Sequence, residues 1–188
     1  MNLSAQTVGR TTFCVHPQPA VRTIPSVGGT KRVNMDKVCN LAATHAIVNI
    51  DETPKKIAKA LASVGISVVV THPIEVLDNL NLFHLLGNLF DRHEQASILS
   101  AQFKTAYDAF LITPPTRSAL YFIWKDPWMT ISRDTYIARF LALAGWRTIG
   151  HDDAVRYPQI TLTDKLLNST DDILFSTEPY AFTESHLD

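Results

Sequence analysis

The stretch HAIVNIDETPKKIAKALASVGISVVVTHP, residues 45–73, decides the fold class of this chain. Its short apolar run at residues 46–50 predicts one strand, and the β-branched run Ser67–Thr71 predicts a second. Apolar residues at helical spacing separate the two runs. The order strand, helix, strand indicates a βαβ unit with a parallel pair of strands, which is typical of α/β proteins.

The helix between these strands is marked at both ends. Thr53 can cap its start, Pro54 suits the first helical position, and Gly65 ends it. The apolar side chains predicted to share its buried face are Ile57, Ala60, Leu61 and Val64.

A long helical segment follows at about residues 77–111. It contains no proline, and its leucine and phenylalanine residues recur at helical spacing. Gly87 and the polar group at 91–93 can interrupt it, so the pattern predicts one or two long helices, ended by Pro114-Pro115. We expect residues 80–111 to be mostly helical and to link two α/β lobes.

The alternation of strands and helices resumes after this segment. Residues 119–124 predict a strand, 135–144 a helix followed by Gly145, 161–168 a short helix, and 173–176 a strand. The predicted division of the chain is an N-terminal α/β lobe at 1–79, a connecting backbone helix at 80–112 and a C-terminal α/β lobe at 113–188.

Composition narrows the classes of function. Of 188 residues, 46% are hydrophobic and 19% are charged, which is typical of a globular protein with a core. The net charge of -1 gives no basic excess, so we expect no nucleic-acid partner. No GxSxG or HExxH motif and no evident acid–base pair is present, so we do not expect an enzyme.

The two cysteines, Cys14 and Cys39, form no CxxC pair. The sequence leaves two alternatives for them, one disulfide bridge or two free thiols.

Two tryptophans stand directly after a predicted strand. Trp124 and Trp128 flank Pro127, and ligands of parallel α/β sheets lie beyond the carboxyl ends of the strands. Aromatic side chains there would form a flat apolar wall for a large planar ligand, with packing in the core as the alternative. Asp134 or Thr135 is expected to cap the helix that follows.

Other predicted strand ends carry polar or aromatic residues as well. Asp51 and Glu52 follow the first strand, and Glu178 and Tyr180 follow the last. Strand ends from both halves indicate one ligand cleft between two lobes, with ordinary solvated loops as the alternative for Asp51 and Glu52.

Two short motifs are weaker. Cys14 and His16 pair a thiol with an imidazole, and both are possible metal ligands, although no third ligand lies nearby. The segment Gly28–Lys31 lacks the spacing of a P-loop or a dinucleotide fingerprint. We therefore interpret it as a turn that brings Lys31 to the edge of the cleft.

These segments resemble a known family, the helical-backbone metal receptor superfamily, whose members are solute-binding proteins of ABC importers for cobalamin or iron chelates. The resemblance covers nearly the whole chain and rests on these segments: Val27–Lys31 with Asn34 and Val38, Thr44–Glu52, Ile123–Thr130 with Asp134–Ile137, Arg156–Ile160, and Ser176–Phe182.

The resemblance implies a fold of two Rossmann-like lobes with parallel sheets, joined by a long backbone helix. It implies a monomer that captures a corrinoid, haem or ferric siderophore between the lobes, without a covalent cofactor, and hands it to an ABC permease in the membrane. The aromatic ligand contacts would be Phe13, Trp124, Trp128, Tyr157 and Tyr180. The polar contacts would be Lys31, Asp51, Glu52, Arg156 and Glu178.

The chain also departs from the family pattern. Relatives carry further elements on both sides, so we expect the chain to be truncated at both ends. The acidic residue that docks the first lobe to the permease falls at about Lys55, and its second-lobe counterpart falls near Thr163 and Asp164. The family implies a periplasmic or cell-surface location. Residues 1–10 show no secretory signal, which keeps open a cytoplasmic metal- or corrinoid-binding enzyme or chaperone.

Overall fold

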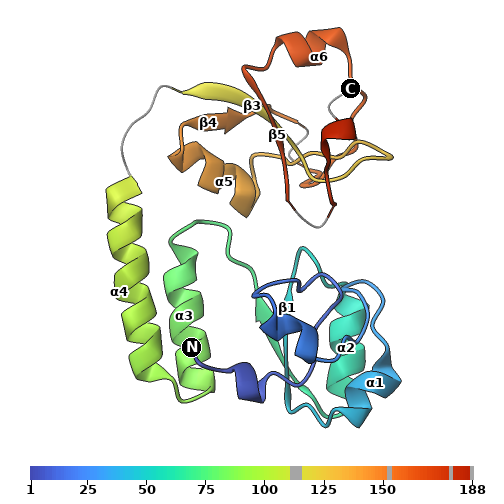
Figure 1. The fold of residues 1–188 in the computed structure, drawn as a ribbon, viewed down its shortest axis with the longest axis vertical. Coiled ribbons are helices and arrows are strands. Elements are labelled where there is room, and N and C mark those ends of the chain that lie inside the picture. The colour runs from blue at the N-terminus through green and yellow to red at the C-terminus, as the bar shows by residue number, and fades with distance from the viewer. Residues whose placement is uncertain (111–115, 152–153, 178–179, 187–188) are drawn as a thin grey trace. The chain divides into compact units, whose positions relative to one another are not determined.

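The computed structural model describes residues 1–110, 116–151, 154–177 and 180–186. The chain divides into two compact units, Met1–His72 and Pro73–Asp188 (Figure 1). Within the described residues, no helix is long and apolar enough to cross a bilayer. The short helices outside the regular layers are η1 (Ser4–Gln6), η2 (Ala20–Thr23), α1 (Met35–Asn40) and η3 (Glu184–His186).

The first unit is built on a parallel pair of strands. β1 (His45–Asn49) pairs with β2 (Ser67–Thr71), and α2 (Lys55–Ser63) forms the crossover between them. The core of this unit gathers under α2 around Val38, Leu61 and Ile66, which are buried. The predicted βαβ unit is therefore confirmed.

The two predicted ends of α2 have different outcomes. The prediction that Thr53 caps α2 is wrong, because Pro54 holds the N-cap position and no side chain accepts a hydrogen bond there. The N–H of Thr53 instead donates to the Asn49 carbonyl at 2.8 Å, so this residue closes the turn after β1. Gly65 as the end is confirmed, with a φ of 86° that favours glycine.

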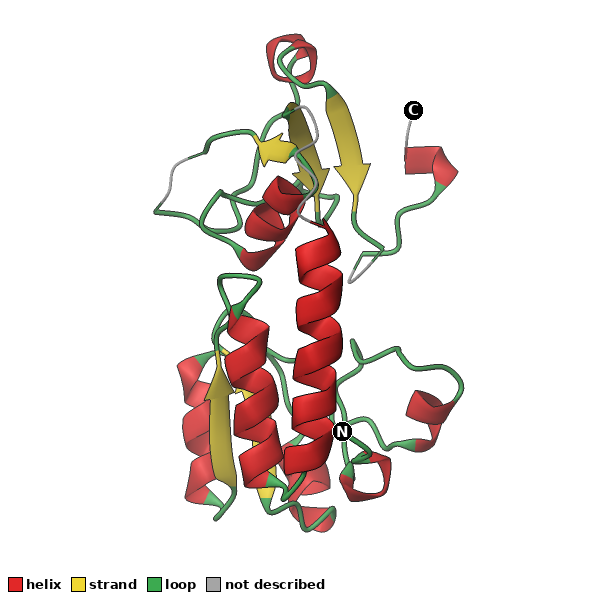
Figure 2. Ribbon diagram, turned by 90° about the vertical axis from the view of Figure 1, so that its left-hand side faces the viewer, coloured by secondary structure: helices red, strands yellow, loops and turns green. Residues whose placement is uncertain are grey.

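The second unit begins with two helices in place of one. α3 (Asp78–Leu89) and α4 (His93–Phe110) lie side by side in both Figure 1 and Figure 2, and they contact each other along their length. The chain reverses at Asp91, which has a φ of 53°. The helical prediction for this segment is confirmed up to residue 110, while Leu111 and Pro114-Pro115 lie outside the described residues. That the helices link two lobes stays a prediction.

Close packing joins α3 to α4. A Cβ atom built on Gly87 would lie 2.6 Å from the Ala96 Cβ atom, so only glycine allows the helices to approach this closely. Ala96 is 1% exposed, which places this contact in the interior of the helix pair.

A three-stranded parallel sheet completes the second unit. β3 (Arg117–Phe122) is central, with β4 (Trp146–Thr148) on one side and β5 (Asp172–Phe175) on the other. Ala119, Leu120 and Phe122 of the central strand are buried, as expected for a parallel strand whose two faces are both covered. The predicted strands at 119–124 and 173–176 are confirmed, with bounds shifted by one or two residues.

Threonine side chains cap both crossover helices of this sheet. Thr135 Oγ1 accepts from the Ala138 N–H at 3.3 Å and starts α5 (Tyr136–Leu143). Thr163 Oγ1 accepts from the Leu166 N–H at 3.2 Å and starts α6 (Asp164–Asn168). The predicted helices at 135–144 and 161–168 are confirmed, although α6 is shorter than predicted.

Candidate functional site

The two candidate tryptophans lie on a tight hairpin that extends from the end of β3. The N–H of Met129 donates to the Trp124 carbonyl, and the N–H of Ile123 donates to the Met129 carbonyl, both at 3.0 Å. Asp126 has a φ of 64° and turns the chain between the two tryptophans. The hairpin therefore places both indoles beyond the carboxyl end of the central strand, where parallel sheets bind ligands.

Around this hairpin the second unit gathers an aromatic cluster. Its members come from the carboxyl ends of β3 and β5 and from the segments that follow them: Phe122, Trp124, Trp128, Phe175, Tyr180, Phe182 and His186.

The cluster has a buried base and an open rim. At the base, the Phe122 ring is 2% exposed and its centroid lies 4.6 Å from that of Trp128. At the rim, Trp124 is 38% exposed and meets the edge of Tyr180 at a centroid distance of 5.1 Å. The prediction that the two tryptophans are not both buried in the core is therefore confirmed. Their place in a cleft stays a prediction.

Polar groups fix the orientation of two rings in the cluster. The Tyr180 hydroxyl lies 3.3 Å from Nε2 of His186, within hydrogen-bonding distance. The Lys125 ammonium lies 5.2 Å from the centroid of the Trp128 ring, which is a cation–π contact. Glu178, the carboxylate predicted beside them, lies outside the described residues.

The segment that carries Arg156 and Tyr157 runs beside the chain after the hairpin. Ser132 N–H donates to the Arg156 carbonyl at 2.8 Å, and Thr130 N–H donates to the Pro158 carbonyl at 3.0 Å. Arg156 Nε donates to the Asp134 carbonyl at 2.7 Å and lies 4.0 Å from its carboxylate. Asp134 therefore holds Arg156, while Thr135 alone caps the following helix.

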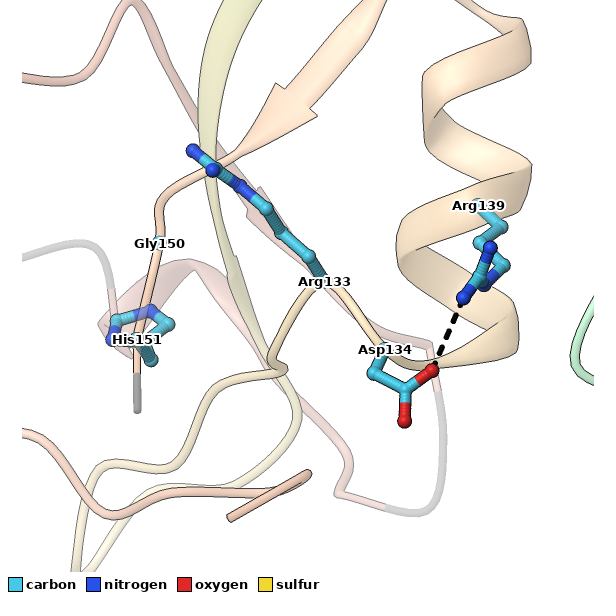
Figure 3. Close-up of a pocket in the computed structure, with 5 residues that line it drawn as sticks. All are labelled: Arg133, Asp134, Arg139, Gly150 and His151. Carbon is cyan, nitrogen blue, oxygen red and sulfur yellow. Dashed lines mark hydrogen bonds and ion pairs between the residues drawn. The ribbon is translucent and has the colours of Figure 1, made fainter. Parts of the chain in front are cut away.

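A polar pocket lies at the carboxyl end of β4. It measures about 540 Å³ and is lined by Arg133, Asp134, Arg139, Gly150 and His151 (Figure 3). In Figure 3, Asp134 and Arg139 point toward each other, while Arg133 extends away from them toward the chain at Gly150. The Arg139 Nη2 to Asp134 Oδ1 distance is 3.1 Å.

The ionisable side chains around this pocket differ in whether they have a polar partner. Arg139 also forms an ion pair with Glu75, so two carboxylates surround its guanidinium. Burial, and then the positive charge of Arg133, lower the pKa of His151 below its ordinary value. The lowered pKa favours the neutral imidazole, and Nε2 of His151 is buried with no hydrogen-bond partner among the described residues.

In the first unit, two pairs of candidate residues lie together. Asp51 lies 3.4 Å from Nε2 of His72, so the ends of β1 and β2 are joined by a carboxylate and an imidazole. The Phe13 ring lies against the turn at Gly29, where a Cβ atom would be 3.3 Å from its Cε2. The predicted turn at residues 28–31 is confirmed by the hydrogen bonds between Gly29 and Arg32, and Lys31 is exposed on it. Glu52 is exposed.

The proposed metal pair stays a prediction. Cys14 and His16 are both exposed, and the Cys14 sulfur lies 3.3 Å from the Thr11 hydroxyl oxygen. No group of three or more possible metal ligands occurs in the part of the chain that the structure describes. Cys14 and Cys39 are both free thiols, so the alternative of a disulfide between them is not realised.

The sequence and the structure of this chain can be compared with those of known proteins. No family model and no curated protein matches the chain. The structure is similar to that of the periplasmic vitamin B12 binding protein of Vibrio cholerae, with a TM-score of 0.77 at 17% identity, over 90% of this chain and 67% of that chain. It is also similar to a periplasmic heme binding protein from Pseudomonas aeruginosa, with a TM-score of 0.75 at 20% identity, over 89% of this chain and 63% of that chain. A third similar structure is the heme-bound periplasmic protein BhuT, with a TM-score of 0.76 at 18% identity, over 89% of this chain and 66% of that chain.

The chain has the fold of these periplasmic binding proteins. This finding confirms the fold class that the family resemblance implied, with parallel sheets in both units. The chain spans about two thirds of the length of these structures.

The two positions at which docking to a permease is predicted are exposed, and the docking itself stays a prediction. Lys55 is the first residue of α2, and Asp164 is the first residue of α6, directly after its cap Thr163. The residues at these two positions are therefore one basic and one acidic residue.

Several residues of the aromatic cluster and of the polar pocket were not predicted from the sequence. Phe122 and Phe175 lie within predicted strands, where an aromatic residue indicates only core packing. Arg133 and His151 belong to loops whose nearness depends on the pairing of β3 with β4, and the three-residue β4 was itself not predicted. The isolated glycine at 150, beside a histidine, is the one local signal that could have drawn attention to this loop.

Proposed function

We propose that this chain is a solute-binding protein of an ABC importer that captures a metal chelate, such as a corrinoid, haem or ferric siderophore, and delivers it to a permease. The observation that carries the proposal is the aromatic cluster at the carboxyl ends of β3 and β5, with its exposed rim at Trp124. An exposed indole supported from below by packed rings is suited to cover a flat apolar ligand.

The remaining candidate residues have roles in the same proposal. Trp128, Tyr180 and Tyr157 would contact the body of the chelate, and Arg156 and Glu178 its polar edge. From the first unit, Phe13 would add apolar contact, while Lys31, Asp51 and Glu52 would meet polar groups. Because a chelate already satisfies most positions of its metal, direct ligands such as Cys14 and His16 are not required for binding.

A binding screen tests the proposal. The tryptophan fluorescence of the protein is titrated with cobalamin, haem and ferrichrome, and with iron and cobalt salts as bare-metal controls. We expect saturable quenching by at least one chelate and none by the salts. Binding of the salts alone would contradict a chelate receptor and favour the Cys14–His16 metal site, which a Cys14→Ser variant would then abolish. Delivery further predicts genes for a permease and an ATPase beside the gene for this chain.

A further inference from the structure

The polar pocket at the end of β4 contains one cation that no acidic group neutralises within the described chain. Arg139 is held between Asp134 and Glu75, whereas the Nη1 and Nη2 atoms of Arg133 form no hydrogen bond or ion pair with the described residues. An arginine with these two atoms free has four N–H bonds available in the plane of its guanidinium.

This guanidinium is nevertheless fixed in place. Its Nε donates to the Thr148 carbonyl, at the last residue of β4, over 3.1 Å. Its flat face rests on Gly150, where a Cβ atom would lie 3.4 Å from the central carbon and 3.5 Å from both terminal nitrogens. One edge and one face of the guanidinium are therefore in contact with the chain, and the remaining edge carries the Nη1 and Nη2 atoms. Figure 3 shows the side chain extended toward Gly150.

The chemistry of this edge suits an oxyanion. Two parallel N–H bonds of arginine match the two oxygens of a carboxylate, and a held guanidinium loses little entropy when it binds one. His151 also lines this pocket, and its Nε2 atom is buried without a hydrogen-bond partner among the described residues.

The pocket and the aromatic cluster lie at the same edge of one sheet. The strand order is β4-β3-β5, all parallel, so Gly150 and His151 follow one outer strand while Tyr180 follows the other. Trp124 follows the strand between them. Neighbouring strands lie about 4.8 Å apart, so the outer strands are separated by about 10 Å across the sheet. Thr148 at the end of β4 pairs with Ala119, whereas Phe175 at the end of β5 pairs with Phe122, three residues farther along β3. This offset adds about 10 Å along the strands, so the outer strand ends are about 14 Å apart. A single flat ligand can therefore span from aromatic rings to a cation.

We propose that Arg133 binds a carboxylate on the edge of the ligand whose flat body rests on Trp124 and Tyr180. This inference rests on the proposed function and names the substrate class of that site: a planar metal chelate that carries carboxylates, in preference to a corrinoid edged with neutral amides. Arg133 is then the residue that determines specificity between the two.

The test compares two forms of one chelate that differ only in charge. Haem carries two carboxylates, and haem dimethyl ester has the same ring without the charges. Both are titrated against the wild-type chain, Arg133→Gln and Arg147→Gln. Arg147 is an exposed arginine in the middle of β4, so its replacement removes the same charge at a neighbouring place and serves as the matched control.

We expect Arg133→Gln to weaken haem binding about tenfold to hundredfold, as for the loss of a charge-assisted hydrogen bond, and to leave the ester unchanged. Arg147→Gln should bind both ligands like the wild type. An equal loss for haem and its ester, or an equal loss in both variants, would overturn the role of Arg133.

Failure of the proposed function would give a different result. If the wild-type chain binds neither haem, its ester nor cobalamin, the chelate proposal fails, and sodium propionate then probes the pocket alone. Shifts of the Arg133 Nε–H and His151 ring resonances in NMR spectra, absent in Arg133→Gln, would show that the pocket still binds a carboxylate. Unchanged resonances at saturating propionate would reject the carboxylate site.

Discussion

Replacement of Trp124 by alanine tests the aromatic rim most directly. The side chain is 38% exposed, and a tryptophan buries at most ~250 Å² when covered, so about 95 Å² of indole is available to a ligand. At about 25 cal/mol per Å², full coverage contributes about 2.4 kcal/mol and half coverage about 1.2 kcal/mol. We therefore expect Trp124→Ala to weaken chelate binding between about sevenfold and fiftyfold.

A second tryptophan provides the control for this change. Trp146 begins β4, at the opposite edge of the sheet from the hairpin, and its Nε1 donates to Asp172 over 2.8 Å. Trp146→Phe removes an indole and one hydrogen bond, so it should reduce stability by about 1 kcal/mol and leave the affinity unchanged.

The assay is isothermal titration calorimetry with the chelate selected by the fluorescence screen, because it does not depend on the indole removed. Thermal unfolding monitored by circular dichroism confirms that both variants are folded at the titration temperature. Wild-type affinity in Trp124→Ala, or an equal loss of affinity in both variants, would refute the assignment of the rim.

Three further predictions concern the second unit. Gly87→Ala should lower the free energy of unfolding by about 1–3 kcal/mol, because its Cβ atom would lie 2.6 Å from that of Ala96. Urea denaturation of this variant, of Ala96→Gly and of the double variant should show that the two changes compensate, and strictly additive values would contradict this packing. Phe122→Ala should cost about 3–5 kcal/mol in the same assay, since the ring is 2% exposed, and a cost below about 1 kcal/mol would place the ring outside the core. The lowered pKa of His151 means that the unfolded chain binds its proton more tightly, so this contribution to stability is present above the ordinary pKa and is lost as pH falls through the folded value. His151→Gln should flatten the decline of the unfolding temperature as the pH falls below about 6.5, and an unchanged profile would contradict the burial of the imidazole.

Local patterns in the sequence predicted most of the regular elements. The βαβ unit at residues 45–73 is predictable from sequence, because the spacing of apolar residues, the β-branched runs and Gly65 all indicate the same structure. The end of α2 at Gly65 depends only on nearby residues, because the N–H groups of Gly65 and Ile66 donate to carbonyls at most five residues earlier. The cap of the same helix was mispredicted, since Thr53 and Pro54 both suit a helix start and the turn at Asn49 decided between them.

The sequence also indicated one part of the candidate site. Trp124 and Trp128 stand next to a turn proline directly after a strand, and both the strand end and the turn are local features. Their supporting rings depend on parallel pairing, which sets Phe122 beside Phe175 across more than fifty residues of chain. No local pattern specifies which distant strand becomes a neighbour.

By itself, then, the sequence determined the α/β class, the helical middle segment and the strand that ends at the tryptophans, because periodicity and turn residues act over a few positions. Only the tertiary structure decided the sheet order β4-β3-β5 and the meeting of Arg133 with Thr148 and Gly150. The three residues of β4 have too little intrinsic preference to form a strand alone. They become one by hydrogen bonding to β3, and that pairing places the pocket of Arg133 and the exposed Trp124 at one edge of the same sheet.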